Sequence, residues 1–205
     1  MTDTAPLSQN EIDLVDKAID EYVASAPNEY IFKQRKHLAN MLTIIKNGGK
    51  RLTEVARIKF NEVEPNFSDG FVTFKMRAEK SNREILCGVE QNMFNELKES
   101  GFIYKNDVSA SRCIYTFVRK LNKFIIEKYN VDLHLHPHKF RHNFVAVLLR
   151  TINPNTGNFH TTQDISECTG NLPSTLEKHY KHLVPERCVE VLKSISPNIV
   201  RNNGV

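Results

Sequence analysis

The chain has 205 residues, a length that fits one domain or one domain with a small appendage. Its 40% hydrophobic and 25% charged residues are ordinary for a soluble globular protein, and a net charge of +4 with a pI of about 8.8 permits a nucleic-acid partner without requiring one. Four separated cysteines with no C-x-x-C pair argue against a disulfide framework or a zinc ribbon, and the lack of a signal peptide or a long apolar run predicts a cytoplasmic protein with no membrane span.

The amino-terminal part is predicted to be helical after a flexible arm at residues 1–7. Ser8-x-x-Glu11 is a capping box, and apolar residues follow it on one helical face. A second helix should stop at Asn47-Gly48-Gly49, since glycine readily adopts the left-handed conformation of a helix C-cap. A short helix should begin directly after Arg51.

The middle of the chain is predicted to form a β-hairpin. Residues 71–76 are a β-branched and aromatic run, 78–82 a polar turn and 84–87 a returning strand. Helical periodicity resumes at Val89 and ends at Gly101, and a longer helix follows.

The carboxy-terminal third should be helical again. His138 opens one helix, and the turn-rich loop 153–161 separates it from a short helix that ends at Gly170. Pro185 suits the first position of a final helix.

A second capping box, Ser174-x-x-Glu177, would start the helix that carries Tyr180 in its second turn. With no repeats or convincing linkers, residues 8–205 are expected to form one domain. The predicted fold class is mainly α with a small antiparallel β-sheet (α+β).

Two arginines stand out as candidates to hold a phosphate group. Each guanidinium can grip phosphate oxygens with two parallel hydrogen bonds and stays charged, which suits Arg51 and Arg141. Taken singly, a surface salt bridge is the commoner role for either residue. His138 lies three residues before Arg141 on the same predicted helix, so their side chains share a face and can meet one phosphate.

Five segments, in this order, resemble the tyrosine recombinase (phage integrase) family. They are Gly48-Gly49-Lys50-Arg51-Leu52-Thr53-Glu54, Lys80-Ser81-Asn82-Arg83-Glu84-Ile85, His138-Lys139-Phe140-Arg141-His142, Thr169-Gly170-Asn171 and Tyr180-Lys181-His182. The resemblance covers residues from about 6 to 192 and implies the catalytic-domain fold of that family. Diverged boxes and an Asn- and Lys-rich composition look similar to integrases of archaeal viruses and plasmids.

The resemblance also implies roles for individual residues. Arg51 would be the first catalytic arginine, with Glu54 as the buried partner that orients it, and Arg141 the second. His138 would assist proton removal from the nucleophile or hydrogen-bond the phosphate. Lys80, in the hairpin turn, would protonate the leaving 5′ oxygen, and Lys75 is its rival.

Of the last two segments, the one with Asn171 departs from the family pattern and the one with Tyr180 fits it. Family members usually carry histidine or tryptophan where this chain has Asn171, which can donate a hydrogen bond but cannot transfer a proton. Tyr180 fits the family's nucleophile, both in its separation from Asn171 and in its Ser174-Thr175 flank. A tyrosine is weakly nucleophilic at neutral pH and needs nearby cations or a base.

The activity implied is site-specific DNA recombination. Tyr180 would form a 3′-phosphotyrosyl bond and release a 5′ hydroxyl on double-stranded DNA, within a homo-tetramer and without a metal or nucleotide cofactor. The family's amino-terminal clamp domain is expected to be missing, so the chain would be a fragment or a short form. The sequence leaves open the DNA target, the direction of recombination and the mobile element served.

Two other functions stay open. Asn171 and the missing clamp favour an impaired DNA-binding relative of the family. Alternating histidines at His134, His136 and His138, with His142, would favour a zinc-dependent hydrolase, although no carboxylate ligand pattern accompanies them.

Overall fold

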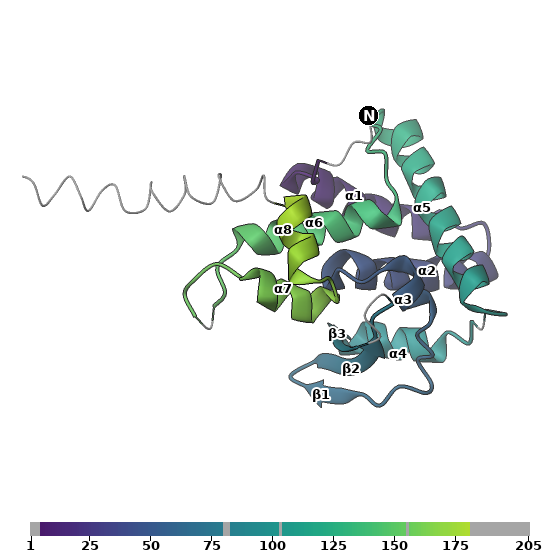
Figure 1. Cartoon of the computed structure of the whole chain (residues 1–205). Coiled ribbons are helices and arrows are strands. Elements are labelled where there is room, and N and C mark those ends of the chain that lie inside the picture. Colours follow the sequence, from purple (N-terminus) through teal and green to yellow (C-terminus); the bar gives the residue numbers. More distant parts are fainter. Residues whose placement is uncertain (1–4, 80–82, 103, 155, 181–205) are drawn as a thin grey trace, which may run out of the picture.

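The computed structural model describes residues 5–79, 83–102, 104–154 and 156–180 (Figure 1). These residues form mostly helices and a three-stranded antiparallel sheet of order β1-β2-β3. This confirms the predicted fold class, mainly α with a small antiparallel sheet. The elements are α1 (Gln9–Ala24), α2 (Glu29–Gly48), α3 (Leu52–Ala56), β1 (Asn66–Ser68), β2 (Phe71–Arg77), β3 (Glu84–Glu90), α4 (Gln91–Glu99), α5 (Asp107–Tyr129), α6 (Pro137–Arg150), α7 (Thr162–Thr169) and α8 (Pro173–Tyr180). None of the helices within those ranges has the length and apolar character that crossing a membrane takes.

Local sequence signals set the first three helices. Ser8 and Glu11 form the predicted capping box of α1. Helix α2 ends as predicted at Gly49, whose φ of 60° lies in the left-handed region. A Cβ at this position would also lie 2.3 Å from the Phe144 ring, so both backbone and packing require glycine here. The chain then turns directly into α3, with Arg51 as its N-cap residue.

The hairpin forms as predicted, with two differences at its edges. Val89 belongs to β3 and not to the following helix, because Ile85, Cys87 and Val89 alternate as buried residues along the strand. Helix α4 therefore begins only at Gln91. Strand β1 was not predicted, since its three residues are all exposed and carry no core pattern.

Two apolar cores of unequal size hold these elements together. The large core lies between helices α1, α2, α3, α4 and α5, the sheet and the start of α6. Its 28 buried residues in the described part of the chain include Val15, Leu42, Phe74, Phe94, Leu121 and Phe140. The small core lies between α6, α7 and α8. Its buried members are Val145, Ala146, Leu149, Ile165 and Leu176.

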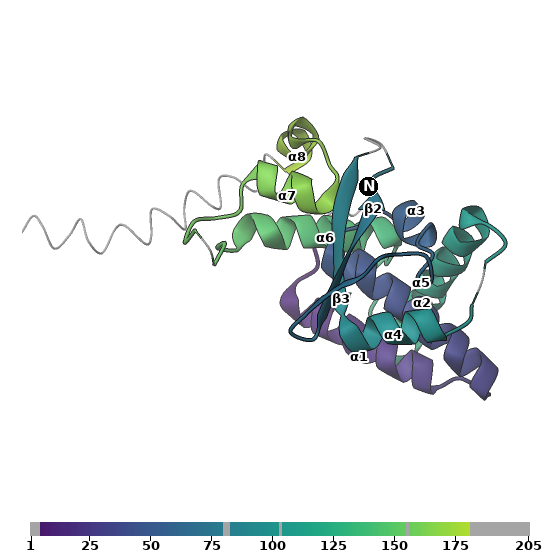
Figure 2. The same cartoon turned by 90° about the horizontal axis from the view of Figure 1, so that it is seen from below.

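The α7–α8 corner lies beside the hairpin (Figure 2). Helix α7 ends at Gly170, which has a φ of 68° and packs so closely on the hairpin that a Cβ would lie 2.8 Å from that of Ala78. The predicted capping box at Ser174 was wrong, because α8 already begins at Pro173. Proline suits the first position of a helix, since it has no N–H to leave unpaired and its φ is preset.

Candidate active site

Arg51 stands at the junction of α2 and α3 and is tied to Glu54. Its Nη1 lies 2.7 Å from Glu54 Oε1, and its backbone N–H donates to Glu54 Oε2 at 2.7 Å. The Glu54 side chain is fully buried, and its Oε1 also accepts the backbone N–H of Glu79 at the base of the hairpin, at 3.0 Å. Glu54 is thus the buried partner of Arg51 that the family resemblance implied.

The charge of Glu54 depends on these donors. Burial alone would raise the pKa of the Glu54 carboxyl, but the backbone N–H groups of Arg51 and Glu79 and the Arg51 guanidinium together lower that pKa below its ordinary value. Glu54 is therefore ionised at neutral pH, and its negative charge partly balances the cationic site.

Arg141 reaches the same place from α6. It is only 3% exposed. Its Nη1 donates to the backbone oxygen of Gly49 at 2.5 Å and lies 3.6 Å from Glu54 Oε2, whereas its Nη2 donates to the backbone oxygen of Thr169 at 3.0 Å. One guanidinium thereby joins the end of α2, the end of α7 and the carboxylate that orients Arg51.

Asn171 brings the two arginines together. Its Oδ1 accepts from Arg51 Nη2 at 3.0 Å and from Arg141 Nη2 at 2.5 Å. Guanidinium groups only donate, so the atom facing them must be the amide oxygen and not the nitrogen. The sequence suggested that Asn171 donates to phosphate. The structure shows the amide first as an acceptor that orients both arginines, with no acceptor for its Nδ2 within the described ranges.

His138 lies in the first turn of α6, in the same pocket as the arginines. It is exposed as a whole, and its ring lies 4.2 Å from that of His142 between centroids. Partial desolvation first, then the positive charges of His142 and Arg141, lower the pKa of His138 to about 4. The ring is neutral at pH 7, and so low a pKa makes it a weak proton acceptor. The role of His138 stays a prediction.

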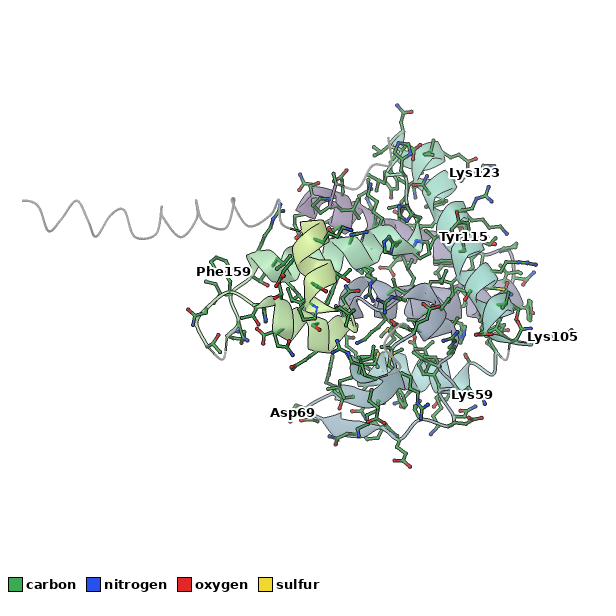
Figure 3. The ribbon with its side chains drawn as sticks, in the orientation of Figure 1. Lys59, Asp69, Lys105, Tyr115, Lys123 and Phe159 are labelled. Atoms are coloured by element: carbon green, nitrogen blue, oxygen red, sulfur yellow. The ribbon has the colours of Figure 1, made fainter. Side chains whose placement is uncertain are left out.

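A pocket of about 270 Å³ lies beside the two arginines. Arg51, His138 and Arg141 line it together with Tyr115. Tyr115 belongs to α5 and is labelled in Figure 3. Tyr115 is 47% exposed. No local motif marked it, because it reaches the pocket from the distant helix α5.

The remaining predicted residues stand differently. Lys80 lies outside the described residues, although the hairpin on either side of it is formed. Its rival Lys75 is exposed and pairs with Glu84 at 3.0 Å. Tyr180 ends the described part of α8, and its side chain is not described. The roles of Lys80 and Tyr180 stay predictions.

Two of the four predicted zinc-ligand histidines have local partners of their own. His136 caps α6, its Nδ1 accepting the N–H of Lys139 at 3.2 Å, and His134 faces Asp132 with Nδ1 3.2 Å from Oδ2. Within the part of the chain that the structure describes, no group of three or more His, Cys, Asp or Glu side chains could hold a metal ion. The zinc alternative therefore gains no support from these residues.

Solved structures with the same arrangement of elements are site-specific recombinases. XerH bound to a palindromic difH substrate, a post-cleavage complex, matches with a TM-score of 0.62 and 18% identity over 91% of this chain and 52% of that one. The XerH pre-cleavage complex with difH gives 0.58 and 17% over 84% and 49%, and XerA recombinase 0.57 and 17% over 93% and 64%. The fold is that of a tyrosine recombinase catalytic domain.

Curated sequences give a second comparison, although no protein-family model matches this chain. Transposase B from transposon PsiTn554 of Staphylococcus aureus is 24% identical in an alignment 202 residues long, which covers 91% of this chain and 31% of the transposase. Transposase B from transposon Tn554 of S. aureus strain Mu50 is 23% identical over 201 residues, with the same coverage. The chain thus spans about a third of the length of these relatives.

Proposed function

We propose that this chain is the catalytic domain of a DNA recombinase of the tyrosine type, which cuts and rejoins DNA strands through Tyr180. The observation that carries the proposal is the convergence of Arg51 and Arg141, which both line the pocket, on one oxygen atom, Asn171 Oδ1. Two guanidinium groups that share one oxygen acceptor provide what a non-bridging phosphate oxygen needs: several donors and two positive charges.

On this proposal the chemistry is a transesterification. The Tyr180 oxygen attacks the scissile phosphorus, its proton passes to the neutral His138 ring, and Arg51 and Arg141 stabilise the charge on the non-bridging oxygens. Lys80 gives a proton to the departing 5′ oxygen as the phosphotyrosyl bond forms. Rejoining is the reverse, with another 5′ hydroxyl as the attacking group, so the bond energy is kept without a nucleotide cofactor.

The likeness to XerH–difH complexes and to transposase B supports double-stranded DNA as the partner and a mobile element as the setting. Residues 8–205 would form the catalytic domain, after an arm at 1–7, and four copies would act together on DNA. The curated relatives come from staphylococcal transposons, so kinship with archaeal integrases stays a prediction that they do not support.

A nicked suicide substrate tests the proposal, because its cleaved end diffuses away and the covalent complex accumulates. We expect a protein–DNA band from the unchanged chain and none from Tyr180→Phe. The Phe variant should bind the same DNA with nearly unchanged affinity, measured by fluorescence anisotropy. Tyr115→Phe is the matched control, and a band that persists in Tyr180→Phe but disappears in Tyr115→Phe would transfer the nucleophile to α5.

Asn171 favours a second candidate function, that of a DNA-binding relative with impaired cleavage. An amide orients the arginines but is not a cation and cannot transfer a proton. Binding of nicked DNA without any covalent band, at all enzyme concentrations, would favour this reading over the first.

A further inference from the structure

The carboxy-terminal end of α7 is surrounded by cations from three other elements. Arg141 of α6 donates to the backbone oxygen of Thr169, and the buried Lys50 Nζ, between α2 and α3, donates to that of Cys168. Arg83, the residue before β3, donates to the backbone oxygen of Ser166 at 2.5 Å. The last carbonyl groups of a helix carry its partial negative charge, so cations are favourable there.

Arg83 differs from the other two because it bonds the backbone of Asn171. Its Nη2 lies 3.1 Å from the backbone oxygen of Asn171, and Ser166 Oγ donates to the same oxygen at 2.6 Å. The backbone and the side chain of Asn171 are thus held by different residues. The backbone is tied to the hairpin through Arg83, and the amide oxygen receives the two arginines of the site.

We propose that Arg83 is a positioning residue: it fastens the backbone of Asn171 to the β2–β3 hairpin, and the hairpin thereby sets where the Asn171 amide stands between Arg51 and Arg141. In the sequence, Arg83 comes three positions after Lys80, the predicted proton donor. This inference rests on the proposed function for its kinetic test, although its structural test does not.

The positioning role of Arg83 can be distinguished from the effect of its positive charge alone. The Nε of Arg83 is buried and has no hydrogen-bond partner within the described residues, so all the bonds described come from one terminal nitrogen. A lysine has three donors on its terminal nitrogen and can make the same contacts. Arg83→Lys should accordingly keep most of the function and Arg83→Gln should lose it. Arg77→Gln, which removes a positive charge from an exposed position of β2, is the matched control.

The first measurement is the single-turnover cleavage rate on nicked DNA at saturating protein. We expect about a tenfold loss for Arg83→Gln, recovery in Arg83→Lys and no change in Arg77→Gln. If Arg83 acts through Asn171, the double variant Arg83→Gln/Asn171→Leu should be no slower than Asn171→Leu alone. Multiplied losses in the double variant would mean that Arg83 acts elsewhere and would overturn the proposal.

The second measurement does not need cleavage. The side-chain amide of Asn171, identified by its loss in Asn171→Leu, should show a lower NMR order parameter in Arg83→Gln than in the unchanged chain. Arg83→Lys should restore it, and Arg77→Gln should leave it unchanged. An unchanged order parameter in Arg83→Gln would overturn the inference. A chain that never forms the covalent complex but shows this loss of order would overturn the proposed function and leave Arg83 as the anchor of Asn171.

Discussion

Arg51 and Asn171 hydrogen-bond to each other, yet the elements that carry them are held in different ways. Arg51 stands between α2 and α3, which contribute Met41, Leu42 and Val55 to the large core. Asn171 stands between α7 and α8, which rest on the small core of five buried residues. The first half of the site is fixed mainly by apolar packing, whereas the second has far less of it.

Polar bonds make up the difference at the α7–α8 corner. Lys50, Arg83 and Arg141 each donate to a backbone oxygen at the end of α7. Burial lowers the pKa of the Lys50 ammonium, and its two carbonyl partners, Leu86 and Cys168, supply the acceptors that a buried cation needs. A site built this way assembles only when hairpin, α2, α6 and α7 are all in place, which couples phosphate binding to the fold.

The largest expected effect comes from removing either arginine. Arg51→Ala and Arg141→Ala should each slow single-turnover cleavage by roughly 10²- to 10³-fold, because each stabilises charge in the transition state. Arg57→Ala, which breaks an exposed pair with Asp107, is the control and should cleave normally. Near-normal cleavage by Arg51→Ala would leave Arg51 with a structural role only.

The two arginine variants should differ in stability, which sharpens the comparison. Arg141→Ala leaves the buried backbone oxygens of Gly49 and Thr169 without a donor, so we expect a loss of about 2–3 kcal/mol in the free energy of unfolding. Arg51 is more exposed and bonds no backbone oxygen in the described structure, so its loss should be smaller. Urea unfolding of both variants measures this, and equal losses would contradict the assignment of Arg141 as the bridge between the two halves.

A second effect concerns the leaving group. If Lys80 protonates the departing 5′ oxygen, Lys80→Ala should cleave ordinary DNA about 10²-fold more slowly. The rate should recover when that oxygen is replaced by sulfur, which leaves without a proton. The same substrate should not rescue Arg141→Ala, whose defect is on the non-bridging oxygens. Rescue of Lys75→Ala instead would assign the proton donor to Lys75, and rescue of neither would point to His138 or water.

Local signals were sufficient to predict much of the fold. The capping box at Ser8, the left-handed Gly49 and the alternating residues of β2 depend on neighbours within a few positions. Errors arose where signals compete at an element boundary. Pro173 starts α8 before the expected cap at Ser174, and buried alternation carries β3 on to Val89.

Order and spacing suggested the residues of the candidate site but not the contacts among them. Arg51, His138 and Arg141 line one pocket, and their catalytic roles stay predictions. The bond from Arg51 to Asn171 spans 120 positions of the chain, and the one from Arg83 to Asn171 spans 88. Nothing in a single sequence specifies that an asparagine oxygen will receive two guanidinium groups, because that depends on how α3, α6 and α7 pack.

The unequal cores predict unequal consequences of two similar substitutions. Leu176 and Leu42 are both fully buried, and Leu→Ala at such positions costs about 2–5 kcal/mol. Leu42→Ala should lower the stability of the whole domain. Leu176→Ala should mainly speed amide hydrogen exchange in α7 and α8, with exchange in α2 and α5 little changed. Equal acceleration in all four helices would mean that the two cores unfold as one unit.

The smallest effect should be a pH dependence of the free energy of unfolding, caused by a histidine of α2 beside the large core. Burial lowers the pKa of His37 in α2 to about 4 from an ordinary value near 6.5. Between pH 6.5 and pH 4, His37 therefore binds a proton in the unfolded chain but not in the folded chain. Its contribution to the free energy of unfolding is complete above pH 6.5 and is lost as the pH falls towards 4. The loss should reach roughly 2 kcal/mol at pH 4.5. Urea unfolding at pH 7 and pH 4.5 should show a smaller drop for His37→Phe than for the unchanged chain, while His134→Phe, at an exposed position, should show the full drop. An equal drop in His37→Phe would place the acid-sensitive group elsewhere, with His138 at the site the next residue to test.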